Sequence, residues 1–414
     1  MGLTMCEKIL ANHAGKEYVV PGEIVNINID LTLIKMWSHG LWAYETVEEL
    51  GAKKVFDPEK VVMYDTGSSQ PESTYKCAEL ADKLGVLKSH RYRYKGIFHH
   101  NVMEDGYIVP GMTFAATDSH TTVEGILGCF SIGLGSKDIG VILATGKTWI
   151  KVPETMKIQI NGAFNKWVTP FDFMLNLARE EGLSFGIGRV VEFDGPAVKK
   201  MSIDARITLG ILGLDVGNPI SVMIEPDEVT MNFLSGRTKK NFKVVKNDPD
   251  CNFVKILEKD VSELEPMVAC PHNQANSKPA HQVKGVKINQ AIIGACASSR
   301  LDDLKLAAKI LEGRKIDSSV RFLIVPGTMN VFREMVKEGL DKIFVEAGAQ
   351  IDSPSCRPCC GHNTQQLPGD VTITSSSRNH RGRLLCYEAD IYLGNPATVA
   401  ASAVAGKIID PREL

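Results

Sequence analysis

The sequence carries a cysteine-rich loop that is followed by an arginine-rich segment. Cys356 and Cys359 form a Cys-x-x-Cys pair, and neighbouring prolines and a glycine keep this loop irregular. Arg378, Arg381 and Arg383 then fall within six positions of one another. Thiolates hold soft metal ions and iron–sulfur clusters, whereas guanidinium groups hold carboxylates through paired hydrogen bonds. The two segments together predict a metal centre beside an anionic ligand.

A third cysteine, Cys296, lies just beyond the apolar run 290–294, which is typical of a buried parallel strand. Ligands collect beyond the carboxyl ends of such strands, so Cys296 is placed to join the Cys-x-x-Cys loop as a third metal ligand. Three thiolates suit a structural zinc ion with His362 or Cys360 as its fourth ligand. They equally suit a [4Fe–4S] cluster with one iron open to a substrate. The spacing leaves both centres open, with free thiols as a third alternative.

The elements that must position these residues alternate between strands and helices. In the first region, the periodicity predicts strands at 61–64 and 113–117 and a helix at 72–84. In the last region, it predicts strands at 290–294 and 320–325 and helices at 301–311 and 330–337. This order implies an α/β fold with parallel sheets. Boundary-like segments predict three domains, at 1–155, 156–282 and 283–414.

Composition excludes several classes of protein. The chain has 414 residues, which is too long for a single hydrophobic core. Its formal net charge of -2 offers no broad basic surface, so nucleic acid is not an expected partner. No run approaches the roughly 18 apolar residues of a membrane helix, and the N-terminus has no apolar signal core. Because the ten cysteines lack the spacing of a disulfide framework, we expect a cytoplasmic protein without membrane contact.

Three sequence blocks carry a family resemblance: residues 294–296, residues 354–361 and residues 376–383. They resemble the signatures of the aconitase superfamily and are most similar to those of the large subunits of isopropylmalate dehydratases and homoaconitases. Similar blocks follow in order along the chain, at 117–121, 144–147, 151–155, 269–273, 389–393 and 396–398. The resemblance implies a three-domain aconitase-like α/β/α architecture that lacks the family's swivelling fourth domain. It also implies a partner, a separate small subunit that supplies this swivelling domain and its serine base.

The resemblance implies a role for each matching residue. Cys296, Cys356 and Cys359 match the ligands of a [4Fe–4S] cluster. The matching catalytic positions are His99, Asp118, His120, Asp65 and Asp215. The matching substrate-binding positions are Arg378, Arg383 and Ser377. Asp118 and His120 correspond to the family's paired acid and histidine, in which the carboxylate would orient the imidazole for proton transfer.

Several positions depart from the family's pattern. The family commonly has Asp-His where this chain has Asp65-Thr66. An asparagine and a glutamate are expected where Ile211 and Asp215 stand, and an asparagine is expected at Ser377. Because these changes surround the expected cluster, they bear on the choice of substrate and on the path of the proton.

The expected function is that of the large subunit of a [4Fe–4S] hydro-lyase acting on a small hydroxylated di- or tricarboxylate. The substrate expected first is 3-isopropylmalate, as in amino-acid biosynthesis, with another malate derivative close behind. In this scheme the open iron binds the hydroxyl and one carboxylate, while His120 and His99 assist the loss of water. The alternative is a divergent paralogue, non-catalytic or differently specific, that keeps a structural metal or cluster.

Overall fold

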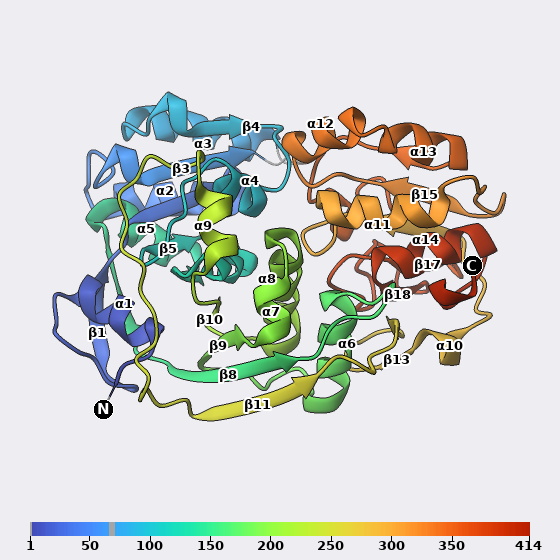
Figure 1. Ribbon diagram of the computed structural model, residues 1–414. Coiled ribbons are helices and arrows are strands. Elements are labelled where there is room, and N and C mark those ends of the chain that lie inside the picture. Colours follow the sequence, from blue (N-terminus) through green and yellow to red (C-terminus); the bar gives the residue numbers. More distant parts are fainter. Residues whose placement is uncertain (1, 66–70) are drawn as a thin grey trace. The chain divides into compact units, whose positions relative to one another are not determined.

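The computed structural model describes residues 2–65 and 71–414 (Figure 1). The chain divides into two compact units, each built from separate segments of the sequence. The first unit contains Met1–Gln159, Gly186–Gly195 and Pro219–Glu258, and the second contains Ile160–Phe185, Pro196–Asn218 and Lys259–Leu414. The division into domains at 1–155, 156–282 and 283–414 stays a prediction. Among the described residues, no helix is both long and apolar enough to cross a membrane.

A five-stranded parallel sheet forms the centre of the first unit. Its strand order is β4 (Arg91–Arg93), β3 (Val61–Asp65), β2 (Leu31–Lys35), β5 (Thr113–Ala116) and β6 (Phe130–Gly133). Strands β2, β3 and β5 are buried along their whole length, as expected for a parallel sheet that is covered on both faces. Because the strands are parallel, the carboxyl ends of β2, β3 and β5 lie at the same edge.

Helices and two smaller sheets complete the first unit. The helices are α1 (Met5–Ala14), α2 (Ser38–Glu49), α3 (Pro71–Lys83), α4 (Phe98–Glu104), α5 (Ser136–Thr145) and α9 (Glu228–Leu234). The 3-10 helices are η1 (Pro58–Lys60), η2 (Lys88–His90) and η3 (Ser119–Leu127). Strand β1 (Ile24–Asn28) pairs antiparallel with β7 (Lys147–Lys151). A four-stranded sheet, mostly in this unit, has the order β10 (Ser221–Met223), β9 (Arg189–Asp194), β8 (Glu154–Asn161) and β11 (Lys255–Asp260).

A seven-stranded sheet forms the centre of the second unit. Its order is β13 (Ser277–Pro279), β12 (Met267–Ala269), β18 (Asp390–Gly394), β17 (Val371–Thr374), β14 (Gln290–Ile293), β15 (Arg321–Ile324) and β16 (Gln350–Ile351). The five strands from β18 to β16 are parallel, whereas β12 and β13 are antiparallel to their neighbours. The carboxyl ends of β14, β16 and β17 therefore share one edge.

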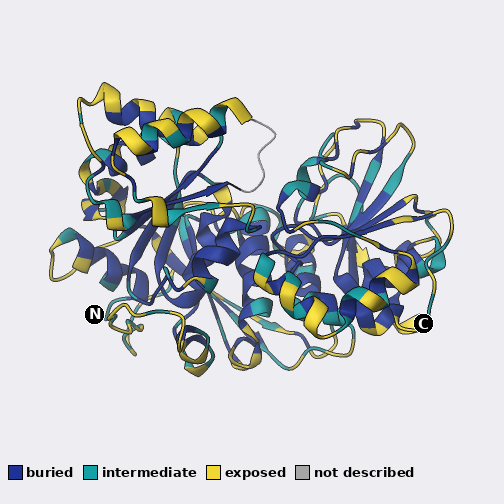
Figure 2. Cartoon of the chain, turned by 90° about the horizontal axis from the view of Figure 1, so that it is seen from above, coloured by how far each residue is buried: buried dark blue, intermediate teal, exposed yellow. Residues whose placement is uncertain are grey.

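The helices of the second unit pack on this sheet or beside it. They are α6 (Pro170–Glu181), α7 (Pro196–Lys200), α8 (Ile203–Gly217), α10 (Ala280–Val283), α11 (Leu301–Leu311), α12 (Met329–Lys337), α13 (Leu340–Ala347), α14 (Pro396–Ala405), η4 (Arg357–Cys360) and η5 (Pro411–Glu413). Figure 2 shows that the central strands are mostly buried, while many helices carry a stripe of exposed residues. This is the pattern of amphipathic helices that cover a sheet.

The predicted α/β fold with parallel sheets is confirmed. The predicted helix at 301–311 coincides with α11, and the predicted helix at 72–84 lies within one residue of α3. The predicted strands at 61–64 and 290–294 likewise match β3 and β14 to within one residue. These segments were predictable because their apolar runs and periodicity agree with their burial.

Candidate active site

Two predicted site residues, Asp65 and Asp118, lie with Lys35 at the carboxyl edge of the first unit's central sheet. Lys35 ends β2, Asp65 ends β3, and Asp118 follows β5. Asp118 caps the 3-10 helix η3, because its side chain accepts a hydrogen bond of 3.0 Å from the backbone N–H of His120. The sheet topology thus brings together residues that are far apart in the sequence.

His99, on α4, is fully buried and lies between two carboxylates. Its Nε2 is 3.2 Å from Oδ1 of Asp118, and its Nδ1 is 2.8 Å from Oε1 of Glu124. The other oxygen of Asp118, Oδ2, is 3.2 Å from Nζ of Lys35. That ammonium group also lies 3.7 Å from the centre of the Trp37 ring, a cation–π distance. The side chains of Lys35, Asp118, His99 and Glu124 thus form a row in which basic and acidic groups alternate.

These contacts shift the pKa values of the groups. Burial alone would lower the pKa of His99, but the charge of Glu124 and the hydrogen bonds to Asp118 and Glu124 raise it to about 9. Burial opposes ionisation of Asp118, yet Lys35 and His99 hold its pKa well below the usual range. Burial raises the pKa of Glu124, and His99 offsets part of that effect. The contacts therefore favour the charged forms of His99 and Asp118.

The other predicted catalytic residues of this unit occupy distinct surroundings. His120 is buried, and its ring centre lies 6.3 Å from that of His99 in an edge-on arrangement. The imidazole that contacts Asp118 at 3.2 Å is that of His99, whereas Asp118 accepts from the backbone of His120. Asp65 is buried and forms an ion pair of 3.3 Å with Nε of Arg93. Thr66, the departure next to Asp65, lies outside the described residues.

Sequence reasoning missed Lys35 and Glu124. Lys35 directly follows residues 31–34, three of which are apolar, so its place at the carboxyl end of a buried strand was a usable signal. Glu124 follows His120 by four residues, but the 3-10 geometry of η3 and its contact with α4 were not readable from spacing. A fully buried glutamate needs a partner, and only the fold shows that this partner is His99.

At the edge of the second unit's sheet, three loops carry the predicted metal and substrate residues. Cys296 follows β14, Cys356 and Cys359 follow β16, and the arginine-rich segment 378–383 follows β17. Because β14, β16 and β17 are parallel members of one sheet, these loops emerge at the same edge. Cys296 and Cys356 are buried, and Cys359 is half-buried.

Hydrogen bonds connect these loops. Ser375 accepts from the backbone N–H of Gly294 at 3.3 Å and donates to the carbonyl of Ser298 at 3.4 Å, which joins the loops after β17 and β14. Nη2 of Arg383 donates to Sγ of Cys359 at 3.2 Å, which joins the loops after β17 and β16. The guanidinium therefore lies where it can stabilise a negatively charged sulfur.

The donor set fits an iron–sulfur cluster. Three thiols reach one sheet edge, and one accepts a hydrogen bond from a guanidinium, as cluster sulfurs do. The described residues contain no group of three His, Cys, Asp or Glu side chains placed to hold a single metal ion, as the zinc alternative requires. In a cluster each thiolate binds a different iron, so the three sulfurs need not surround one ion. The absence of a single-ion site therefore does not test the cluster. Cys360, the proposed fourth zinc ligand, has its sulfur 3.6 Å from that of Cys359.

The predicted substrate residues of this unit are partly engaged with the protein itself. Nε of Arg378 forms an ion pair of 2.7 Å with Oδ1 of Asp215, whose side chain is only 3% exposed. Asp215 lies on α8, and its ion pair joins this helix to the arginine-rich segment; its catalytic role stays a prediction. Ser377 is buried, and its carbonyl accepts from the side chain of Gln274 at 2.9 Å. Arg383 has no partner for its buried Nε among the described residues.

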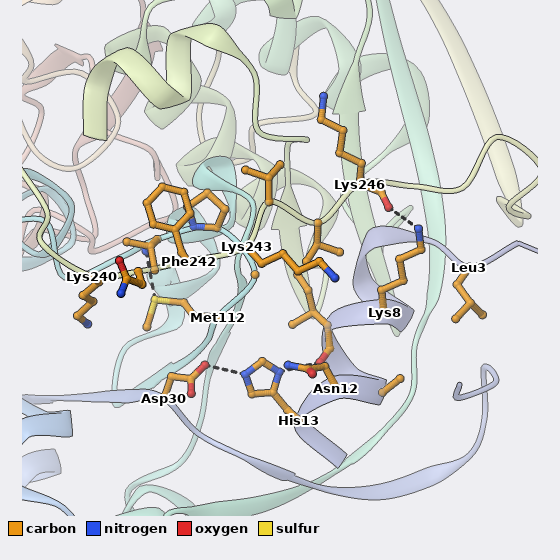
Figure 3. Close-up of a pocket in the computed structure, with 18 of the residues that line it drawn as sticks. Leu3, Lys8, Asn12, His13, Asp30, Met112, Lys240, Phe242, Lys243 and Lys246 are labelled. Carbon is orange, nitrogen blue, oxygen red and sulfur yellow. Dashed lines mark hydrogen bonds and ion pairs between the residues drawn. The ribbon is translucent and has the colours of Figure 1, made fainter. Parts of the chain in front are cut away.

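A cavity of about 980 Å³ lies in the first unit, and none of the predicted site residues lines it. Figure 3 shows Lys240, Phe242 and Lys243 from an extended segment facing His13 and Asp30. Nε2 of His13 and Oδ2 of Asp30 are 2.6 Å apart. This cavity is thus a feature separate from the residues predicted to be catalytic.

Comparisons with known proteins match the chain along its length. The aconitase family model (aconitate hydratase) matches residues 64–279 and 273–406. The chain belongs to the aconitase family. A "probable 3-isopropylmalate dehydratase large subunit" of Methanothermobacter thermautotrophicus is 39% identical over 423 residues, covering 100% of both chains. The 3-isopropylmalate dehydratase large subunit of a Hydrogenobaculum species is 38% identical, and large subunit 1 of Pyrococcus furiosus is 37% identical, each covering 100% of this chain and 99% of the relative.

As a member of the aconitase family, the chain is a hydro-lyase, and its resemblance to the large subunits is confirmed. A crystal structure of aconitase X from Thermococcus kodakaraensis aligns with 90% of this chain at 14% identity. Its TM-score of 0.49 adds nothing to the family assignment, which rests on the sequence matches. The roles of the individual site residues stay predictions, supported by the geometry described above.

Proposed function

We propose that the chain is the large subunit of a two-subunit [4Fe–4S] hydro-lyase that dehydrates or isomerises a small hydroxylated di- or tricarboxylate. The observation that carries this proposal is the arrival of Cys296, Cys356 and Cys359 at one sheet edge, beside Arg383. The relatives are large subunits of 3-isopropylmalate dehydratases, which supports 3-isopropylmalate or another malate derivative as the substrate.

In this proposal the three cysteines hold the cluster. When bound, the cluster supplies a Lewis-acidic iron for the substrate hydroxyl and an adjacent carboxylate. Arg383 and Arg378 are the cations available for a substrate carboxylate, because guanidinium groups bind carboxylates through two parallel hydrogen bonds. Nε of Arg378 already donates to Oδ1 of Asp215, which helps to fix the position of this guanidinium.

Dehydration breaks one C–H and one C–O bond. A base on the small subunit would take the carbon-bound proton, and the electron pair left behind forms the double bond as hydroxide departs. His120 would donate the proton that converts the departing hydroxide to water, with Asp118 fixing the backbone at His120. Asp65, held by Arg93, supports the same sheet edge as Asp118.

The test is anaerobic reconstitution of the chain with iron and sulfide, followed by addition of the small subunit and 3-isopropylmalate. We expect about four irons and four sulfides per chain, a change in the cluster spectrum on adding substrate, and formation of the unsaturated acid. The same assay with other hydroxylated di- and tricarboxylates tests which acid is the preferred substrate. Stoichiometric zinc without any response to these acids would instead support a structural metal.

A further inference from the structure

Glu124 is a buried carboxylate to which the proposed reaction gives no role. It is fully buried on η3, and its Oε1 contacts Nδ1 of His99 at 2.8 Å. Its Oε2 has no hydrogen-bond partner among the described residues. A buried carboxylate with one unpaired oxygen is costly, so the interaction with His99 must offset a large part of its desolvation.

The charges around this pair come from several elements. His99 faces Glu124 from α4, while Asp118 faces His99 from the start of η3. Lys35 faces Asp118 from β2. The Cys129 thiol is also close enough for the charge of Glu124 to raise its pKa, in addition to the effect of burial. His120 also lies close enough to Asp118 to contribute to the lowering of the Asp118 pKa.

Both ring nitrogens of His99 therefore meet a carboxylate oxygen. A neutral imidazole has only one N–H, so it can donate to one of the two carboxylates and must present a lone pair to the other. An imidazolium donates to both. The distance of 2.8 Å to Glu124 suits a charge-assisted hydrogen bond, and the distance of 3.2 Å to Asp118 lies at the long end of the range for an N–H···O hydrogen bond.

We propose that Glu124 is a positioning residue that keeps His99 doubly protonated, so that His99 acts as a fixed cation behind Asp118 and not as a proton carrier. This inference rests on the proposed function and divides the work of its two histidines. His99 holds the Asp118 carboxylate ionised and in place, and His120 alone exchanges a proton with the leaving hydroxyl. A different protonation of the same pair would overturn this proposal. In that arrangement Glu124 is protonated and donates a hydrogen bond to the lone pair on Nδ1 of a neutral His99.

Nitrogen NMR of the ring distinguishes the two arrangements. The full chain is labelled with ring-¹⁵N histidine, and the His99 signals are identified by their loss in His99→Asn. We expect both His99 nitrogens to carry protons from pH 6 to pH 8, as a pKa of about 9 requires. An unprotonated Nδ1 at neutral pH would refute the proposal from the parent protein alone, even if no Glu124 variant folds.

The variants Glu124→Gln and Glu124→Asp test whether Glu124 is what keeps His99 doubly protonated. Loss of the Glu124 charge should lower the pKa of His99 by roughly 1–3 pH units, and the conservative Glu124→Asp should restore part of it. Glu192→Gln is a matched control, because Glu192 is also buried in the first unit but pairs with Lys157 at 3.4 Å. If Glu124→Gln folds and leaves the His99 titration unchanged, Glu124 does not set the charge of His99.

A second readout separates this inference from the proposed function. In the complex with the small subunit, Glu124→Gln should lower kcat with little change in KM and should introduce a new ionisation near neutral pH. An inactive parent complex with a doubly protonated His99 would refute the proposed reaction but not the charge of His99. An active parent whose His99 is neutral would refute only the positioning role.

Discussion

The carboxyl edges of the two central sheets carry different chemistry on the same topology. In the first unit, Lys35, Asp118, His99 and Glu124 form a chain in which each charge meets an opposite one. In the second unit, the corresponding edge gathers thiols from loops joined by a few hydrogen bonds. The first edge is therefore ordered by the protein's own charges, whereas the second gathers the soft donors that the proposed cluster would use. Mutations should affect the two edges in different ways.

The largest expected effect is at the thiol edge. Cys359→Ser should abolish retention of the [4Fe–4S] cluster, because it removes one of the three proposed thiolate ligands and serine is a hard and weakly acidic replacement. Activity should fall by more than about a thousandfold. Iron and sulfide content and the visible absorbance of the reconstituted chain measure this loss. The fold should persist, since Cys359 is half-buried in a loop.

Cys360→Ser is the control for that experiment. The two sulfurs are 3.6 Å apart, so the variants perturb the same loop in nearly the same place. We expect Cys360→Ser to keep its iron and sulfide. If this variant loses the cluster while Cys359→Ser retains it, the ligand assignment within the pair is wrong.

The next largest effect is at the charged edge. Asp118→Asn should lower kcat by roughly 10²–10⁴-fold and reduce the free energy of unfolding by about 3 kcal/mol, because it removes the buried carboxylate charge that lies between Lys35 and His99. Since the pKa of Asp118 is lowered, its stabilising effect is present above the usual carboxylate pKa and disappears as the pH falls through the folded value. Urea unfolding at several pH values measures it.

An exposed ion pair provides the contrast. Glu72 and Lys76 on α3 are 2.8 Å apart, but the Glu72 side chain is 83% exposed. Glu72→Gln should leave stability and activity unchanged within error. Equal losses in the two variants would show that burial does not distinguish the charged edge from the surface.

A smaller effect is expected at Asp215. Asp215→Asn removes the charge that holds Nε of Arg378, so we expect KM to rise by roughly tenfold with a smaller change in kcat. Asp204→Asn is a matched control, because Asp204 lies on the same helix and pairs with Arg300 at 3.1 Å. A rise in KM with Asp204→Asn of the same size would assign the effect to helix α8 and not to Arg378.

The same comparison explains which features were predictable. The strands were predictable from apolar runs, and the cysteines and arginines from a distinctive pattern that the aconitase family shares. The contact of Asp118 with the imidazole of His99 was not predictable. It depends on how α4 approaches η3, a tertiary contact that leaves no periodic signal in the sequence.

Lys35 and Asp215 give a second example of contacts that could not be predicted from the sequence. An isolated lysine or aspartate in a sequence is usually a solvated side chain. Burial with a partner of opposite charge gives each a structural task, and that partner lies 83 residues away for Lys35 and 163 residues away for Asp215. Family resemblance identified Asp215 as a site residue, but only the fold shows that it contacts Arg378.

A weaker effect on stability is expected from a second, more exposed ion pair of the first unit, that of His13 and Asp30. His13 and Asp30 form a pair beside the cavity of Figure 3, with the Asp30 side chain 35% exposed. Burial alone would lower the pKa of His13, but the hydrogen bond to Asp30 raises it; the pKa of Asp30 is lowered, chiefly by His13, against the effect of burial.

The stabilisation from His13 is therefore fully present below the ordinary histidine pKa of about 6.5 and is lost as the pH rises through the higher folded value. Asp30 sets the acid limit, because its contribution disappears as the pH falls through its lowered pKa. His13→Gln should cost about 0.5–1 kcal/mol near pH 5–6, reduced by the solvent around Asp30, and progressively less above that range. Urea unfolding from pH 4 to pH 9 measures this, with His281→Gln on a more exposed histidine as the control. A loss that stays constant up to pH 9 would show that His13 acts through packing, which would leave the charged edge as the clearer case of stabilisation by ionised groups in this unit.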